Sequence, residues 1–139
     1  MPFLLDTNIL SELRKGARCN PNVSNWAAKE SGQAHYISVL SLGEIRKGIE
    51  LLRKKSSADC MPLENWLQKL QSDYASCTIA ITAEIAERWG ELSALRPLPV
   101  IDSLLAATAL EHGLTLATRN TKDFNGLGIA IVNPFQKLP

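Results

Sequence analysis

The sequence predicts an α/β fold with three layers, α/β/α, in which helices cover both faces of a central parallel sheet of four to five strands. Short apolar runs rich in strand formers alternate with longer segments whose apolar residues recur at helical spacing. This alternation is typical of a parallel sheet with crossover helices. The chain has 139 residues, 45% of them hydrophobic, and shows no linker or internal repeat, so we expect one domain.

The first part of the chain predicts two strands and two short helices. The apolar run 3–5 (FLL) is typical of a buried strand, and a short helix is expected over 9–15, where Gly16 ends it. A turn at 20–22 precedes a second helix over 23–29. The segment 35–40 (HYISVL) is rich in strand formers.

A long helix is expected next. Ser41 and Glu44 have the spacing of a capping box, which predicts a helix that begins at Ser41. Apolar residues recur at helical spacing through Lys55, and Glu44 lies near the seam between this apolar stripe and solvent.

The middle of the chain predicts a helix over 62–74, opened by a proline, and a short β-branched strand over 78–81. A further helix is expected over 82–95, followed by a rigid proline-containing connector.

In the last part, Asp102 is expected to cap a helix that is apolar on nearly every side and that Gly113 ends. Strands are expected over 114–118 and 129–132, separated by a polar turn or a single helical turn over 119–124.

Four acidic residues occupy corresponding places in this layout. They follow strands or stand in the first turn of helices, and they are Asp6, Glu44, Asp102 and Asp123. Because functional sites of open parallel sheets lie at the carboxyl ends of the strands, we expect the four carboxylates to meet there. Crowded carboxylates repel each other unless a hard divalent cation lies among them. The sequence therefore predicts a site for Mg²⁺ or Mn²⁺, whose usual role is phosphoryl chemistry.

Each acid also has a structural explanation when taken alone. Asp6 and Asp102 fit helix N-caps, Glu44 fits the capping box, and Asp123 fits a turn. The combination favours a site, since all four fall at equivalent positions. Asp6 in addition follows a buried strand, where an unpaired charge is costly.

Composition excludes several classes of protein. The net charge of +1 gives no global basic excess for nucleic acid, so any basic surface is local. Three cysteines without CxxC spacing argue against a disulfide framework or a zinc site. No signal peptide and no stretch of about 20 apolar residues is present, so we expect a cytoplasmic protein without membrane contact.

Four sequence segments carry a family resemblance. They are LLDTNILSELRKG, YISVLSLGEIRKGIELL, the run from AERWGEL to PLPVIDSLLAATALEHGLTLATRNTKDF, and the closing VNPF. In this order they resemble PIN-domain proteins of the VapC toxin family, in its FitB-like branch. The resemblance covers most of the chain and implies a single PIN domain over residues 1–139. It also implies a metal-dependent ribonuclease that acts as the toxin of a type II toxin–antitoxin pair.

Transferred to this sequence, the family's catalytic and metal-binding acids are Asp6, Glu44, Asp102 and Asp123, with Mg²⁺ or Mn²⁺ as cofactor. Neutral polar residues near the same edge are expected to orient the carboxylates or hold a water: Thr7, Thr118 and Asn120. Basic residues near the motifs are candidates for RNA phosphate contacts: Arg14, Lys15, Arg46, Lys47, Arg119 and Lys122. The histidines His35 and His112 are expected to be structural, which disfavours a mechanism with two catalytic histidines.

The expected partners are an RNA substrate and a cognate antitoxin protein. The resemblance implies a homodimer or a larger hetero-oligomer with the antitoxin, which would bring promoter DNA as a further partner. An alternative is a subunit of a DNA-binding repressor complex with little nuclease activity of its own. A phosphatase with an aspartyl nucleophile is disfavoured, because Asn8 stands where such enzymes usually carry a second Asp.

Overall fold

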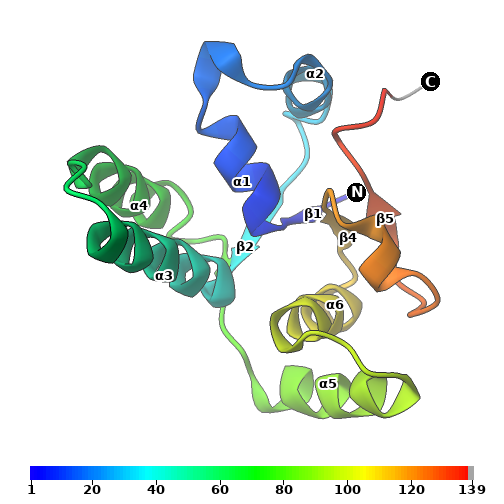
Figure 1. Cartoon of the computed structure of the whole chain (residues 1–139). Coiled ribbons are helices and arrows are strands. Elements are labelled where there is room, and N and C mark those ends of the chain that lie inside the picture. The colour runs from blue at the N-terminus through cyan, green and yellow to red at the C-terminus, as the bar shows by residue number, and fades with distance from the viewer. Residues whose placement is uncertain (138–139) are drawn as a thin grey trace.

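A computed structural model describes residues 1–137 of the chain, and they form a parallel sheet covered by helices (Figure 1). The strands are β1 (Phe3–Leu5), β2 (His35–Ser38), β3 (Thr78–Ile79), β4 (Thr115–Ala117) and β5 (Ile131–Val132). The α-helices are α1 (Thr7–Leu13), α2 (Pro21–Lys29), α3 (Val39–Lys55), α4 (Met61–Asp73), α5 (Ala83–Leu95) and α6 (Val100–His112), and two short 3₁₀ helices are η1 (Gly16–Arg18) and η2 (Thr121–Phe124).

The sheet has the strand order β3-β2-β1-β4-β5, and every neighbouring pair is parallel. The α/β class and the number of strands are therefore as predicted. Strand β1 is central, with Leu4 paired to Tyr36 of β2 and to Leu116 of β4. Since all strands run the same way, their carboxyl ends meet at one edge of the sheet.

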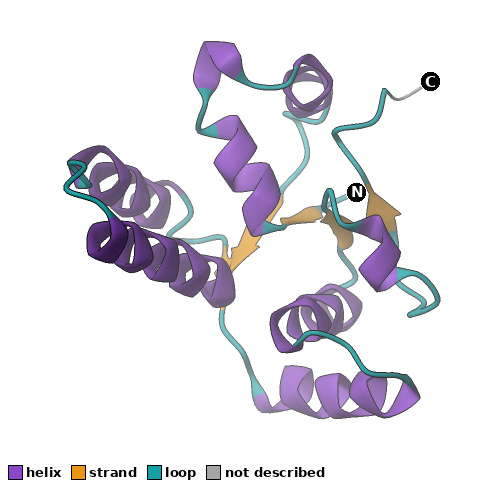
Figure 2. Ribbon diagram, viewed as in Figure 1, coloured by secondary structure: helices purple, strands orange, loops and turns teal. Residues whose placement is uncertain are grey.

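The alternation of side chains along β1 separates two hydrophobic layers. Phe3 and Leu5 belong to the core shared with α1, α2, α3 and α4. Leu4 points to the other face and belongs to the core formed with α5 and α6. Figure 2 shows these two groups of helices on opposite sides of the strands. This arrangement is the three-layer architecture that the sequence predicts.

Helix α6 lies in the second core, as its uniformly apolar sequence predicts. Leu105, Ala106 and Ala107 are each fully buried. Gly113 ends the helix in the left-handed conformation at φ 63°, as expected of a C-terminal glycine. Within residues 1–137, no helix is long and apolar enough to span a bilayer.

Helices α1 and α2 begin earlier than predicted. Helix α1 starts at Thr7, because the Asp6 carboxylate caps it by accepting the Thr7 backbone N–H. Helix α2 starts at Pro21, where a turn was expected, because the Asn20 side chain accepts the N–H of Asn22. A proline lacks the N–H that the first helical turn leaves unpaired, so Pro21 suits this position.

The predicted capping box at Ser41 and Glu44 is wrong. Helix α3 begins at Val39, and Ser38 is its N-cap, with its hydroxyl accepting the Leu40 N–H at 3.0 Å. Glu44 therefore lies in the second turn and is not a capping residue. Asp102 is not a cap either, because Pro99 precedes α6 and Asp102 stands in its first turn.

Candidate active site

Asp6 lies at the end of the central strand and is held by three donors. Its Oδ1 accepts the Thr7 backbone N–H at 2.7 Å, and its Oδ2 accepts the Thr118 hydroxyl at 2.8 Å and the Asn8 amide at 3.4 Å. The side chain is nearly inaccessible, with 6% of its surface exposed. Burial raises the pKa of Asp6 despite these hydrogen bonds, and the nearby Glu44 charge adds to the rise.

Thr7 joins Asp6 to Glu44. Its hydroxyl donates to Glu44 Oε1 at 2.6 Å, while its backbone N–H binds Asp6. The Thr7 oxygen also lies 2.9 Å from the hydroxyl of the fully buried Ser41. Because a hydroxyl has one hydrogen, Thr7 donates to the carboxylate, and Ser41 is then free to donate to Thr7. The second turn of α3 is thereby fixed against the start of α1.

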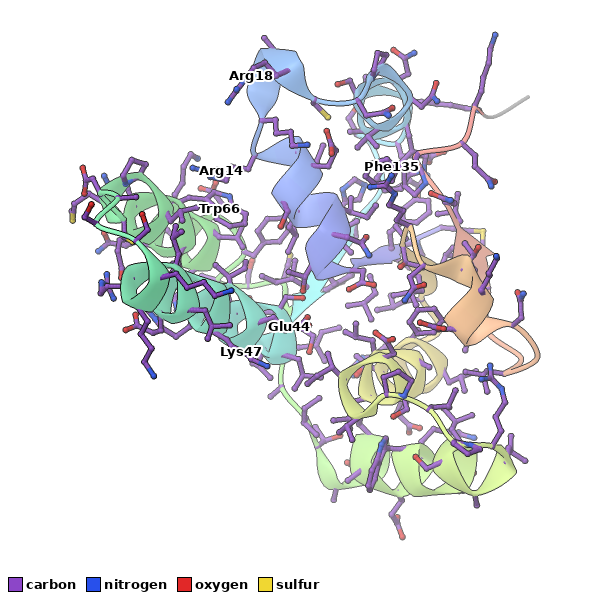
Figure 3. All side chains as sticks on the ribbon, in the orientation of Figure 1. Arg14, Arg18, Glu44, Lys47, Trp66 and Phe135 are labelled. Atoms are coloured by element: carbon purple, nitrogen blue, oxygen red, sulfur yellow. The ribbon has the colours of Figure 1, made fainter. Side chains whose placement is uncertain are left out.

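Asp102 is half-buried and is repelled by the charges of the other three acids. Its pKa is raised to about 6, first because burial disfavours the charged form and then because the carboxylates of Asp6, Asp123 and Glu44 repel it. A hydrogen bond with Asp123 adds to this rise. The structure thus brings together the four acids that the sequence singles out. Figure 3 shows Glu44 at the end of α3 that faces α6.

Asn120 and Asp123 belong to the turn after β4. The Asn120 side-chain amide donates to Asp123 Oδ2, and its backbone N–H donates to the Thr118 hydroxyl at 3.0 Å. Thr118 is fully buried. The predicted polar residues Thr7, Thr118 and Asn120 therefore all contact an acid of the site.

The donor set suits a hard divalent cation, because it consists of carboxylate oxygens. Burial, and after it the repulsion by the other carboxylates, raises the pKa of Asp102, and a cation would relieve both effects. Within residues 1–137, no three His, Cys, Asp or Glu side chains are arranged so that they could hold a metal ion as they stand. The hydrogen bonds from Thr7, Thr118 and Asn120 direct several of the carboxylate oxygens toward protein donors instead.

The basic candidates differ in their surroundings. Arg46 donates to Glu64 through both terminal guanidinium nitrogens, at 2.7 and 2.8 Å, and also to Glu50. A phosphate would have to compete with these two carboxylates. Arg14 lies over the Trp66 ring at 5.5 Å, as Figure 3 places them between α1 and α4, and Lys47 lines a groove that it shares with Glu44.

Two residues of the site, Ser41 and Asn8, were not predicted from the sequence as site residues. Ser41 was interpreted as a cap, although its hydroxyl contacts Thr7. Asn8 was considered only as the residue in place of a second Asp, although its amide contacts Asp6 and Thr118 and its oxygen accepts the Arg119 N–H. The signal for Asn8 was present, because a polar side chain in the first turn of α1 stands close to Asp6.

Comparison with known proteins defines the class to which this fold and site belong. The PIN domain family matches residues 3–128. The chain therefore belongs to the PIN-domain family, as its sequence segments suggested.

Several known proteins are similar to this chain over almost their whole length. The plasmid stability protein StbB of Pseudomonas syringae pv. tomato is 29% identical over 139 residues, covering 96% of this chain and 99% of StbB. Toxin FitB of Neisseria gonorrhoeae is 27% identical, covering 96% and 98%, and the VapC ribonuclease Y4jK of Sinorhizobium fredii is 27% identical with the same coverage.

A solved structure of FitAB bound to an IR36 DNA fragment contains a chain that superposes with a TM-score of 0.82 at 25% sequence identity. The match covers 99% of this chain and 98% of that one.

Proposed function

We propose that this chain is a metal-dependent endoribonuclease that acts as the toxin of a type II toxin–antitoxin pair. The observation that carries the proposal is a hydrogen-bond network among the acids, in which Thr7 joins Asp6 to Glu44. Thr118 and Asn120 join Asp6 to Asp123 in the same way. The repulsion of Asp102 by these three carboxylates is consistent with this arrangement. Membership of the PIN-domain family and similarity to the VapC ribonuclease Y4jK support it.

In this proposal the four carboxylates bind Mg²⁺ or Mn²⁺ as metal ligands and catalytic residues. A bound cation would polarise the substrate phosphate and lower the pKa of a bound water. The positive charge also compensates the repulsion that these carboxylates exert on one another.

The other polar residues act by orientation. Thr118 holds Asp6 Oδ2 through its hydroxyl, and Thr7 holds Glu44 Oε1 in the same way. Asn120 holds Asp123. These bonds limit the rotation of the carboxylates, so that a cation would meet them in a nearly fixed arrangement.

RNA is the proposed substrate, and an antitoxin protein is the proposed inhibitor. The proposed cations for RNA phosphates are Arg14, Lys47, Arg119 and Lys122, since Arg46 is engaged by Glu50 and Glu64.

By analogy with the FitAB complex, the antitoxin would bring promoter DNA into the assembly. We further propose that the toxin forms a homodimer, which light scattering at micromolar concentration would test.

A second candidate function is a repressor subunit with little nuclease activity. The observation in its favour is the DNA-bound state of the similar FitAB complex. The two functions differ in one measurable property, which is cleavage of RNA by the purified chain without a partner.

The decisive experiment incubates the purified chain with single-stranded RNA and Mg²⁺ or Mn²⁺. We expect cleavage that excess chelator abolishes, and loss of cleavage in Asp6→Asn and Asp102→Asn, with Glu91→Gln on the surface of α5 as the control. Calorimetric titration with Mn²⁺ should show binding to the wild type and at least tenfold weaker binding to Asp6→Asn. Cleavage by the wild type in excess chelator would refute the proposal.

A further inference from the structure

We infer that Arg119, held against the ring of Phe135, forms a subsite for an RNA backbone phosphate beside the four acids. This inference rests on the proposed function, because it assigns a part of the same substrate to residues that hold no metal. Phe135 belongs to the closing VNPF segment, to which the sequence analysis gave no role.

The guanidinium of Arg119 is held by an aromatic face. Its central carbon lies 4.6 Å from the centroid of the Phe135 ring. The ring itself is fixed, because it packs against the core that contains Phe3 and Leu5. The Phe135 carbonyl accepts the Asn22 amide at 2.8 Å, and its N–H donates to Asn133 Oδ1 at 3.0 Å. Figure 3 shows Phe135 between α2 and the turn after β4.

The backbone of Arg119 is tied to the acid site. Its N–H donates to Asn8 Oδ1 at 3.2 Å, and the amide of Asn8 contacts Asp6 Oδ2. The preceding residue, Thr118, donates its hydroxyl to the same Asp6 oxygen. Arg119 is therefore held at its backbone by Asn8 and at its guanidinium by Phe135, and its position depends on that of Asp6.

The charge of Arg119 remains available. Among residues 1–137, no carboxylate lies within salt-bridge distance of it, whereas Arg46, Arg53 and Arg88 all form ion pairs. Glu12 senses the charge of Arg119, but its pKa is lowered first by a hydrogen bond from Lys15 and only last by the Arg119 charge. Glu12 thus already has another cation as its partner.

An RNA strand needs such a cation at this place. The strand brings a row of negative charges to four carboxylates, and the charge of a divalent cation among the acids would be offset by the carboxylates that hold it. Arg119 adjoins the acids through Thr118 and Asn8, so it can bind a neighbouring phosphate. A guanidinium suits this role, because it keeps its charge and presents parallel N–H donors to two phosphate oxygens. The Phe135 ring reduces the freedom that the side chain loses on binding.

The test measures binding of a fluorescein-labelled single-stranded RNA of random sequence to the full chain in chelator, where no cleavage occurs. We expect Arg119→Ala to raise the dissociation constant about tenfold and to reduce the slope of its logarithm against the logarithm of salt concentration by about 0.7. Arg88→Ala removes an arginine that is paired with Glu111 on the α5–α6 side, and it serves as the matched control with unchanged binding.

A second variant separates the contribution of the Phe135 ring to RNA binding from that of the Arg119 charge. Phe135→Leu keeps an apolar side chain in the core but removes the π face. We expect it to weaken RNA binding about two- to fivefold with the salt slope retained, and Phe135→Trp to restore the wild-type value. Melting temperatures show whether the Phe135 variants fold. If they do not, the RNA affinity of Arg119→Ala alone tests the inference.

Unchanged RNA affinity and an unchanged salt slope in Arg119→Ala would overturn the inference. A variant that binds RNA normally but binds an antitoxin more weakly would overturn it as well. Complete displacement of the RNA by low concentrations of inorganic phosphate would identify a site for the free anion and would overturn the assignment to RNA. If the wild type binds RNA with the predicted dependence on Arg119 but never cleaves it, the nuclease proposal fails and the subsite stands.

Discussion

Thr118 illustrates how one buried hydroxyl orders the site. It donates to Asp6 Oδ2 at 2.8 Å and accepts the Asn120 N–H at 3.0 Å, with no exposed surface. The residue therefore connects the central strand to the turn that carries Asp123. Its sequence position after a strand suggested such a role, but the identity of its partners required the register of β1 and β4.

We expect Thr118→Val to destabilise the fold by about 1–3 kcal/mol, because the isosteric side chain removes one donor from the buried Asp6 carboxylate and leaves the Asn120 N–H without its acceptor. Thr118→Ser retains the hydroxyl and is the control. Urea unfolding measures the stability, and Mn²⁺ titration measures whether the metal affinity falls with it. Equal stabilities of the Val and Ser variants would contradict the role given to the hydroxyl.

Asp102 differs from the other three acids in its partners. Among residues 1–137, no side-chain or backbone amide or hydroxyl donates to its carboxylate, and its pKa of about 6 reflects burial and the charges of Asp6, Asp123 and Glu44. Without a cation, its ionised form therefore opposes folding at neutral pH.

Asp102→Asn should consequently stabilise the chelator-treated protein, by about 1 kcal/mol once screening of this half-buried group by solvent is allowed for. Thermal unfolding at neutral pH measures the change. Saturating Mn²⁺ should reverse the order, so that the wild type becomes the more stable protein, because only it retains the full ligand set. A variant that is less stable than wild type in chelator would show that the carboxylates do not repel each other.

At the scale of elements, an ion-pair network fastens α3 to α4. Arg46 and Arg53 both donate to Glu64 of α4, and both also reach Glu50 on α3. These bonds lower the pKa of Glu64 to about 2. The basic side of α3 that the sequence suggested for RNA is thus partly used to hold its neighbouring helix.

The pH dependence of this network has a definite sign. The folded pKa of Glu64 lies below the value of about 4.3 for an unfolded chain, so its stabilisation is present above that value and is lost as the pH falls toward 2. We expect Glu64→Gln to lower the melting temperature at neutral pH and the difference to shrink steadily below about pH 4. Glu91→Gln, which removes only a long 3.8 Å pair with Arg88, should show a smaller change at neutral pH.

A difference between wild type and Glu64→Gln that stays the same from neutral to strongly acidic pH would contradict the ion-pair assignment. It would indicate that Glu64 contributes through packing against α3 instead.

Element types were predictable from the sequence, whereas helix starts were not. Two serines three residues apart compete for the N-cap of α3, and local spacing favoured Ser41 because Glu44 completes a capping box. The tertiary structure selects Ser38, because β2 ends there and Glu44 bonds to Thr7. A contact between α1 and α3 determines where α3 begins. A local sequence pattern carries no information about such a contact.

At the scale of the molecule, the convergence of the acids depends on the strand order. The parallel class was predictable from the alternation of elements, and it already placed Asp6, Glu44 and Asp123 at one edge. The order β3-β2-β1-β4-β5 was not predictable, since it is determined by how α1 to α4 and α5 to α6 divide between the two faces. The same order brings Arg119 next to Asn8, which no sequence spacing indicates.

A groove of about 530 Å³ leads from the site along α3. Its lining is mostly apolar, with Leu40 and Ile101 within it and the exposed side chains of Val39 and Leu51 at its surface. Glu44 also lines it. The groove therefore suits a partner segment that carries apolar residues and ends in a cation near the acids. We predict that this partner is the antitoxin and that the cation is an arginine, which can bind a carboxylate through two parallel hydrogen bonds.

If an arginine of the antitoxin competes with the metal for these carboxylates, inhibition of RNA cleavage should weaken as the Mg²⁺ concentration rises. Leu51→Glu should weaken antitoxin binding at least tenfold while the free toxin still cleaves RNA, because the substitution places a charge in the apolar groove but leaves the acids unchanged. Met61→Glu alters another exposed apolar residue, which lies outside this groove, and this variant should bind the antitoxin normally. Inhibition that is independent of Mg²⁺, together with normal binding by Leu51→Glu, would place the antitoxin elsewhere on the molecule.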